Sequence, residues 1–219
     1  MTQILFIAVA YLIGSVSFAV VVSWFYGLPD PHTYGSRNPG ATNVLRTGRK
    51  EAAVLTLLGD AAKGAIALSV AKRLALEFNL DEFTLSAVAL ATFIGHLYPL
   101  YFRFKGGKGV STAAGILLAL DLRVAGVALL AWLLTIVALR YSSLASIVAA
   151  LAATIATLYF LGWNPFAGMV LIMTTLLLWR HRANMKRLFD GTESRITLFR
   201  GGSTRPVPSG DEPRSREAP

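Results

Sequence analysis

Long apolar runs alternate with short polar breaks along most of this chain. A bilayer core of about 30 Å needs ~20 apolar residues in a helix, so most of the runs are long enough to span a membrane. The breaks contain Gly, Pro, Asn or charged residues, as turns do. The pattern predicts an all-α, polytopic membrane protein with about seven transmembrane helices. The apolar segments are residues 4–26, 52–76, 83–102, 110–121, 124–140, 142–162 and 164–180.

The fourth segment is short and rich in Gly and Ala, so a tilted or partial span is expected there. Composition agrees with a membrane protein: hydrophobic residues make up 54% of the chain and charged residues only 15%. Soluble domains carry about 25% charged residues. The composition therefore excludes a soluble globule and extensive disorder. The absence of cysteine excludes disulfides, thiolate metal sites and a thiol nucleophile.

The net charge of +9 is distributed unevenly. Of the 21 Lys and Arg residues, seventeen lie in the tail and in the breaks on one side of the expected helices, and Lys63 lies within a helix. The other side has only Lys72, Arg73 and Arg123. Basic loops remain cytoplasmic, so we expect the N-terminus outside and the C-terminus in the cytoplasm. The positive charge therefore indicates which side of the membrane is cytoplasmic, and nucleic acid is not an expected partner.

Two segments follow the last expected span. Met185, Leu188 and Phe189 share one helical face, which predicts a short helix lying in the membrane interface. Residues further on are rich in Gly, Pro, Ser and charge, and such a composition cannot form a core. We therefore expect a membrane domain over residues 1–195 and a disordered, basic cytoplasmic tail over residues 196–219.

The first polar cluster is a long loop of small hydrogen-bonding residues between the first two spans. It can be interpreted equally well as a solvated loop with a turn and a helix cap, or as a polar pocket with a fixed cation. In the second interpretation the side chains bind a polyol and Arg46 binds a phosphate with two hydrogen bonds. The polyol candidates are Ser36, Asn38, Thr42 and Asn43.

The second cluster is a glycine loop, residues 105–109, that leads into the fourth segment. Gly106, Gly107 and Gly109 let backbone N–H groups converge on an anion, and Lys108 adds a positive charge. The helix that follows adds its positive dipole end, where Thr112 can assist. The alternative is a flexible basic loop that serves topology alone. The residue after the lysine is Gly, which excludes a nucleotide P-loop.

The third cluster, residues 180–184, ends the last span. Arg180 and Arg182 are typical of cations that extend to the membrane interface. His181 and Asn184 share one helical face because they are three residues apart. The membrane-interface interpretation explains these two residues less well than it explains the two arginines.

Polar residues also lie within the apolar segments. Asp60 and Lys63 are spaced to form an ion pair on one helix face, which lowers the cost of burying charge. His96 is expected to be a buried, hydrogen-bonded residue, and His32 a surface loop residue. The sequence contains no HExxH metal motif and no GxSxG serine motif, so no metal and no cofactor are expected.

The three clusters together resemble a known family, the bacterial acyl-phosphate:glycerol-3-phosphate acyltransferases (PlsY family). The resemblance rests on GSRNPGATNVLR, GHLYPLYFRFKGGKGVST and RHRAN in this order, and it covers about residues 4–195. DAAKG and YSSLASI also resemble family segments. Two positions depart from the pattern, since Arg37 stands where Gly is commoner and Ala183 where an acidic residue is common.

The resemblance implies an enzyme of the bacterial inner membrane with its active site on the cytoplasmic side. It implies transfer of a fatty acyl group from acyl phosphate to the sn-1 hydroxyl of glycerol 3-phosphate, which yields lysophosphatidic acid and phosphate. We expect a monomer, and docking of a soluble acyl-phosphate synthase stays open. The residues expected to act in catalysis are Ser36, Arg46, Lys108, His181 and Asn184, and those expected to bind substrate are Asn38, Thr42, Asn43, Gly106, Gly107, Gly109 and Thr112.

Two other function classes share some of these features. A transporter of a phosphorylated small molecule would have the spans and the basic loops, but inverted repeats are usual in transporters and the sequence shows none. A non-catalytic scaffold would leave the glycine loop unexplained. The enzyme is therefore the preferred hypothesis.

Overall fold

The computed structural model describes residues 1–196, and every regular element in that range is helical. The predicted all-α class is therefore confirmed for this part of the chain. The α-helices are α1 (Thr2–Ser15), α2 (Phe18–Phe25), α3 (Ala41–Val44), α4 (Lys50–Phe78), α5 (Glu82–Leu97), α6 (Val110–Leu120), α7 (Leu122–Leu139), α8 (Ser142–Leu161), α9 (Pro165–Arg180) and α10 (Arg182–Phe189). Two 3-10 helices, η1 (Leu45–Thr47) and η2 (Leu100–Phe102), complete the described elements.

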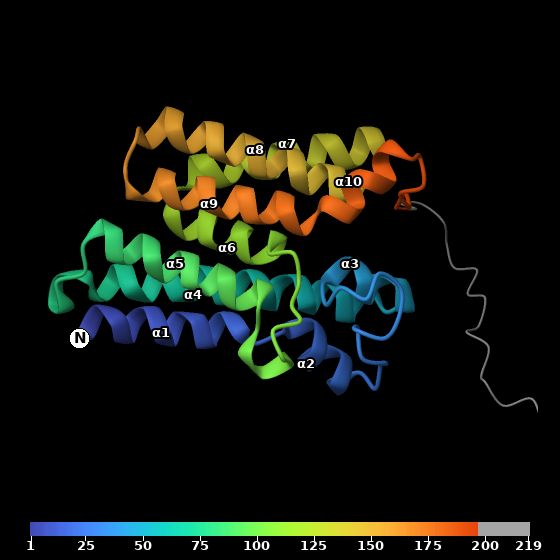
Figure 1. The fold of residues 1–219 in the computed structure, drawn as a ribbon, viewed down its shortest axis with the longest axis horizontal. Coiled ribbons are helices and arrows are strands. Elements are labelled where there is room, and N and C mark those ends of the chain that lie inside the picture. Colours follow the sequence, from blue (N-terminus) through green and yellow to red (C-terminus); the bar gives the residue numbers. More distant parts are fainter. Residues whose placement is uncertain (197–219) are drawn as a thin grey trace, which may run out of the picture.

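The long helices lie side by side in two groups (Figure 1). In the first group, α1 packs along α5, and α4 contacts α1, α2 and α5. In the second, α7 packs along α8 and α8 contacts α9. Two helices join the groups, because α6 contacts both α4 and α7, and α9 contacts both α5 and α8.

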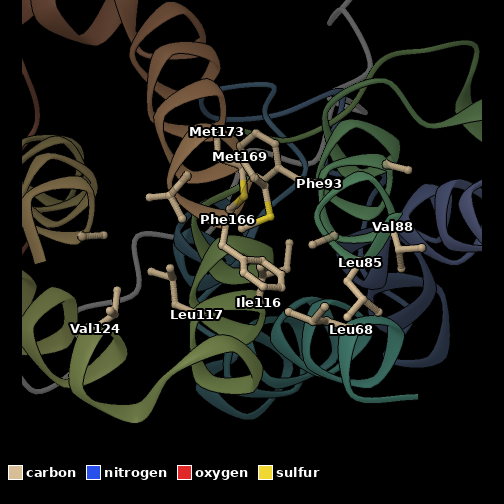
Figure 2. Close-up of a cluster of buried hydrophobic side chains, with 14 of the residues drawn as sticks. Leu68, Leu85, Val88, Phe93, Ile116, Leu117, Val124, Phe166, Met169 and Met173 are labelled. Carbon is tan, nitrogen blue, oxygen red and sulfur yellow. The ribbon is translucent and has the colours of Figure 1, made fainter. Parts of the chain in front are cut away.

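Buried apolar side chains fill the junction between the groups (Figure 2). Phe166, Met169 and Met173 of α9 lie beside Phe93 of α5 and Ile116 of α6, and all five are buried. Apolar side chains gain little by moving from lipid into protein, so close packing and dispersion contribute most to helix association in a bilayer.

Glycines allow the closest helix contacts. A Cβ atom on Gly115 of α6 would overlap the backbone carbonyl of Ala61 on α4. A Cβ atom on Gly14 of α1 would likewise overlap the carbonyl of Thr92 on α5. Small residues at such interfaces let helix backbones approach and are common in membrane proteins.

Four helical segments of the described chain are long and apolar enough to cross a membrane: α4, α5 continued through η2, α7 and α8. The pair α1 and α2 makes a fifth if its 42° bend is accepted within one span. With 11 residues, α6 extends about 16 Å, and with 16 residues α9 extends about 24 Å. Both fall short of a core of about 30 Å. All seven predicted segments are helical, but seven full spans are not confirmed.

A buried ion pair stabilises the break between α1 and α2. Lys63 Nζ donates to Asp60 Oδ1 at 2.8 Å, as the spacing predicts, and to the carbonyl of Val16 at 2.6 Å. The Phe18 amide donates to the same carboxylate at 3.4 Å. Backbone groups freed by the break therefore have partners within the membrane domain.

The third contact of Lys63 explains His96. Lys63 Nζ lies 3.0 Å from His96 Nδ1, and an ammonium can only donate, so this nitrogen accepts. His96 is 7% exposed, which confirms the prediction of a buried, hydrogen-bonded histidine. The network connects the break between α1 and α2 to His96 near the end of α5. The His96 ring in turn lies against Gly107 of the glycine loop.

A helix, α10, is present where the sequence predicts an interfacial one, and Phe189 at its end is 91% exposed. A large exposed aromatic side chain on a short amphipathic helix is typical of a segment at the membrane interface. The predicted disordered tail lies outside the described residues, apart from Ile196, whose amide donates to the carbonyl of Arg140.

The buried pair should contribute far more to stability than an exposed pair. Asp60→Ala leaves the Lys63 ammonium buried without its carboxylate, and we expect a loss of about 3–5 kcal/mol. Lys186→Gln removes an exposed pair with Asp190 at 3.6 Å and should cost about 0–1 kcal/mol. Thermal unfolding of both variants in detergent checks this, and equal losses would contradict it.

Candidate functional site

The three polar clusters meet at one site. Lys108 of the glycine loop donates to Asn184 of α10, with 2.5 Å between Nζ and Oδ1. Arg46 of η1 donates to Ser194, which follows α10, at 3.0 Å. The carbonyl of Pro39 in the first loop lies against Gly107. Segments far apart in sequence are thus brought into contact, as the motifs predicted.

Asn43 organises the first loop. Its side chain is 2% exposed, accepts from the Ser36 amide at 2.9 Å and donates to the carbonyls of Pro31 and Tyr34. These bonds use both ends of the amide group. The geometry therefore supports a function for Asn43 in holding the loop, beside the substrate binding that was predicted.

The other predicted residues of the first loop are more accessible. Ser36, Thr42 and Arg46 are exposed, and Asn38 is partly buried. The Thr42 hydroxyl lies 3.4 Å from the Ser142 hydroxyl at the start of α8. The alkyl part of Arg46 packs over Gly35, next to Ser36. Hydroxyl, amide and guanidinium groups thus line one stretch of loop.

The glycine loop needs its glycines for two reasons. Gly109 has φ +87°, a left-handed conformation that side chains rarely adopt. Gly106 and Gly107 are buried, and a Cβ atom on either would overlap the backbone or ring of His96. The Gly107 amide donates to the His96 carbonyl at 3.1 Å, so it is turned away from any anion. The prediction that the loop amides converge on an anion is therefore wrong for the Gly107 amide.

Arg180 does not simply extend to the membrane interface, as predicted, but binds the glycine loop. Its Nε donates to the Gly107 carbonyl at 3.0 Å and its Nη2 to the Gly106 carbonyl. Arg182, in contrast, is exposed and stacks 4.7 Å from the centre of the Trp179 ring, as a cation at the interface does. Arg180 therefore has a structural function that the interface interpretation did not include.

Lys108 is a partly buried cation with a lowered pKa. Burial lowers its pKa from 10.5 to about 8, the nearby Glu193 carboxylate raises it, and Arg187, Arg180 and Arg46 lower it further. Among residues 1–196, four cations thus act on one another around one neighbouring carboxylate, that of Glu193. Bringing an anion to this cluster would relieve their mutual repulsion.

Glu193 is a site residue that sequence reasoning missed. Burial would raise its pKa, but hydrogen bonds from Ser143, Asn184 and Arg187 lower it, so the group is a carboxylate. The three donors lie at 2.6, 2.6 and 2.7 Å. The one sequence signal for this contact was Gly191, which follows α10 and favours a turn. The turn brings Glu193 back against Asn184.

His181 lies at the joint between α9 and α10 and is 2% exposed. Its Nδ1 donates to the Leu177 carbonyl at 2.8 Å, because a carbonyl can only accept. Burial and the Lys108 charge lower its pKa to about 4. The ring is therefore neutral near pH 7, and Nε2 is a hydrogen-bond acceptor.

Thr112 lies in the first turn of α6 and is fully buried. Its hydroxyl has no hydrogen-bond partner among the described residues 1–196. The geometry gives no support to the predicted contact between Thr112 and a phosphate. Within the same residues no group of three or more His, Asp and Glu side chains could hold a metal ion.

The site can bind anions and hydroxyl groups together. Lys108 and three arginines supply positive charge, His181 supplies a neutral acceptor, and Ser36 supplies an exposed hydroxyl. Such a set suits a phosphorylated polyol.

Comparison with known proteins agrees with this chemistry. A profile of the glycerol-3-phosphate acyltransferase family matches residues 4–191. The glycerol-3-phosphate acyltransferase of Cupriavidus metallidurans is 54% identical over 196 residues, which cover 90% of this chain and 97% of that protein. The enzyme of the same name from Thiobacillus denitrificans is 52% identical over 196 residues, which cover 90% of this chain and 98% of that protein.

Two solved structures share the fold. Both are of PlsY, described as an integral membrane glycerol 3-phosphate acyltransferase, one in a glycerol 3-phosphate form and one in a lysophosphatidic acid form. Their TM-scores are 0.83 and 0.81. Each is 37% identical to this chain, and the matches cover 90% of this chain and 96% of those chains.

The environment of Lys108 predicts an unusual titration. Burial and three arginines lower its pKa to about 8, so the ammonium should lose its proton well before an exposed lysine does. In protein labelled with ¹³C at lysine Cε, the resonance that disappears in Lys108→Gln should titrate near pH 8. Titration of that resonance with the exposed lysines, near pH 10.4, would contradict the described environment.

Proposed function

The chain belongs to the glycerol-3-phosphate acyltransferase family, and from this premise we propose that it uses acyl phosphate as its donor and the sn-1 hydroxyl of glycerol 3-phosphate as its acceptor. The products are lysophosphatidic acid and inorganic phosphate. Lysophosphatidic acid is the substrate for a second acylation in phospholipid synthesis.

One observation carries the proposal: the partly buried Lys108 ammonium donates to Asn184, and Arg46, Arg180 and Arg187 lie close enough to lower its pKa. The reaction brings together two phosphate groups, one on the acceptor and one on the donor. A cluster of cations beside a glycine loop is suited to hold them in the orientation that the transfer requires.

We assign the phosphate-binding part of the site to Lys108 and to the loop amides other than that of Gly107. Arg46 and Ser36 bind the acceptor, with Asn38 and Thr42 nearby on the same loop. Asn184 holds the Lys108 ammonium in place, since its own amide nitrogen is fixed by Glu193.

The transfer proceeds in one step. The hydroxyl oxygen of glycerol 3-phosphate attacks the acyl carbonyl carbon, and the bond from that carbon to the phosphate oxygen breaks. The leaving phosphate takes the bonding electrons, and a phosphate oxygen accepts the hydroxyl proton. Acyl phosphate is an activated anhydride, so positioning and electrostatic stabilisation supply most of the catalysis.

His181 acts as an acceptor that orients a hydroxyl group. With a pKa of about 4 it is neutral but weakly basic near pH 7, so it aligns the nucleophile better than it removes a proton. Cations near the leaving phosphate stabilise the charge that develops there.

The placement of the site in the membrane is also proposed. The basic residues predict a cytoplasmic face that holds the three clusters, with the N-terminus outside, the C-terminus inside and about seven segments in the bacterial inner membrane. A monomer of residues 1–195 then forms the catalytic domain, with the soluble acceptor arriving from the cytoplasm and the acyl chain from the bilayer. Docking of an acyl-phosphate synthase on this face stays open.

Purified protein in lipid, given acyl phosphate and glycerol 3-phosphate, should form lysophosphatidic acid. Lys108→Ala should lower kcat/KM at least about 100-fold, because it removes a cation that stabilises developing charge. Lys105→Ala is the matched control, since its exposed side chain lies in the same loop, and it should stay within about threefold.

Mass spectrometry of the lipid product checks both expectations. Absence of product from folded wild-type protein would refute the proposed reaction. Uptake of labelled glycerol 3-phosphate into vesicles without acylation would favour a transporter. Equal rates for Lys108→Ala and wild type would refute the assignment of Lys108.

A further inference from the structure

Three successive carbonyl groups of the glycine loop are bound by side chains from elsewhere in the chain. The Lys105 carbonyl lies 2.9 Å from His32 Nε2, and the Gly106 and Gly107 carbonyls accept from Arg180. His32 precedes α3 in the first loop, whereas Arg180 ends α9. The loop is therefore held from two directions.

These contacts set which backbone groups the loop can offer to an anion. In a trans peptide the C=O and N–H groups point in opposite directions. Because Arg180 holds the Gly107 carbonyl, the Lys108 amide of the same peptide points away from Arg180. An anion needs N–H groups facing it, and a carbonyl in the same place would repel it.

The Arg180 guanidinium is suited to hold the loop carbonyls. Two of its nitrogens, Nε and Nη2, donate to two adjacent carbonyls, so one rigid planar group fixes both of them. The group also lies 5.5 Å from the centre of the Tyr98 ring. On the other side of the loop, the His96 carbonyl holds the Gly107 amide.

His32 holds the beginning of the loop. Its Nδ1 lies 2.7 Å from a carboxylate oxygen of Asp30 and its Nε2 lies 2.9 Å from the Lys105 carbonyl. Both partners only accept hydrogen bonds, so the ring makes both bonds when each nitrogen carries a hydrogen. The predicted surface histidine is thus a bridge between two loops.

We propose that Arg180 and His32 form a carbonyl clamp that positions the glycine loop for phosphate binding. Both are positioning residues, because they bind the loop and act on substrate through it. The inference rests on the proposed acyl transfer and deepens it. The loop would bind a terminal phosphate group, which either glycerol 3-phosphate or acyl phosphate can supply.

Kinetics of Arg180→Lys test the clamp. The variant keeps the charge but replaces the planar two-nitrogen group with a single ammonium on a flexible stem, so the two carbonyls are held less rigidly. The KM of one phosphate-bearing substrate should therefore rise about tenfold or more, while kcat stays within about threefold. Measuring KM for each substrate in turn identifies which phosphate the loop binds. Arg182→Lys, which changes the neighbouring exposed arginine, should match wild type.

His32→Ala provides a second variant that does not depend on the partly buried Arg180. It removes one of the three carbonyl bonds, so the KM of the same substrate should rise, by less than in Arg180→Lys. Thermal unfolding in detergent shows whether each variant is folded. If Arg180→Lys unfolds, the KM values of His32→Ala test the clamp.

The clamp is overturned if folded Arg180→Lys or His32→Ala has wild-type KM for both substrates. It is also overturned if kcat falls while both KM values stay unchanged, because that pattern indicates a group acting in the transition state. These outcomes differ from failure of the proposed function, in which wild-type protein forms no lysophosphatidic acid.

Discussion

The site depends on keeping one ammonium group, that of Lys108, charged in a partly buried position. Burial favours the neutral amine, as the pKa of about 8 shows. The Asn184 oxygen and the Glu193 carboxylate oppose this effect, and neither residue is on the helix that Lys108 precedes. The glycine loop and the segment of Asn184 and Glu193 must therefore pack together to stabilise the charged form of Lys108.

The helical bundle provides that packing. Of the two helices that join its halves, α9 continues into the segment that carries His181 and Asn184, and α6 begins directly after the glycine loop. Close contacts at Gly14 and Gly115, together with the apolar junction of α5, α6 and α9, hold these helix ends in register. The buried network of Asp60, Lys63 and His96 adds a polar link behind the loop.

Much of this could be predicted from the sequence because the determinants are local. Apolar length predicts the helices, three-residue spacing predicts the Asp60–Lys63 pair, and the glycines of residues 105–109 predict a loop at a helix entry. Family motifs pointed to Lys108 and Asn184, which lie in direct contact.

The rest depends on tertiary contacts. Whether Arg180 extends to the interface or binds a loop depends on a chain segment 73 residues away, and spacing does not encode that. Glu193 enters the site only because the chain reverses after α10. Helix length rather than hydropathy distinguishes α6 and α9 from the longer helices, so the hydropathy pattern alone does not establish that these two segments cross the membrane.

The central claim is that the positive charge of Lys108 is used by a bound phosphate. The most direct measurement is the titration of the ¹³Cε resonance of Lys108 with and without saturating inorganic phosphate. A bound anion favours the charged amine, so the account predicts a pKa that rises above about 8 when phosphate is present. A titration unchanged by phosphate that is shown to be bound would contradict it.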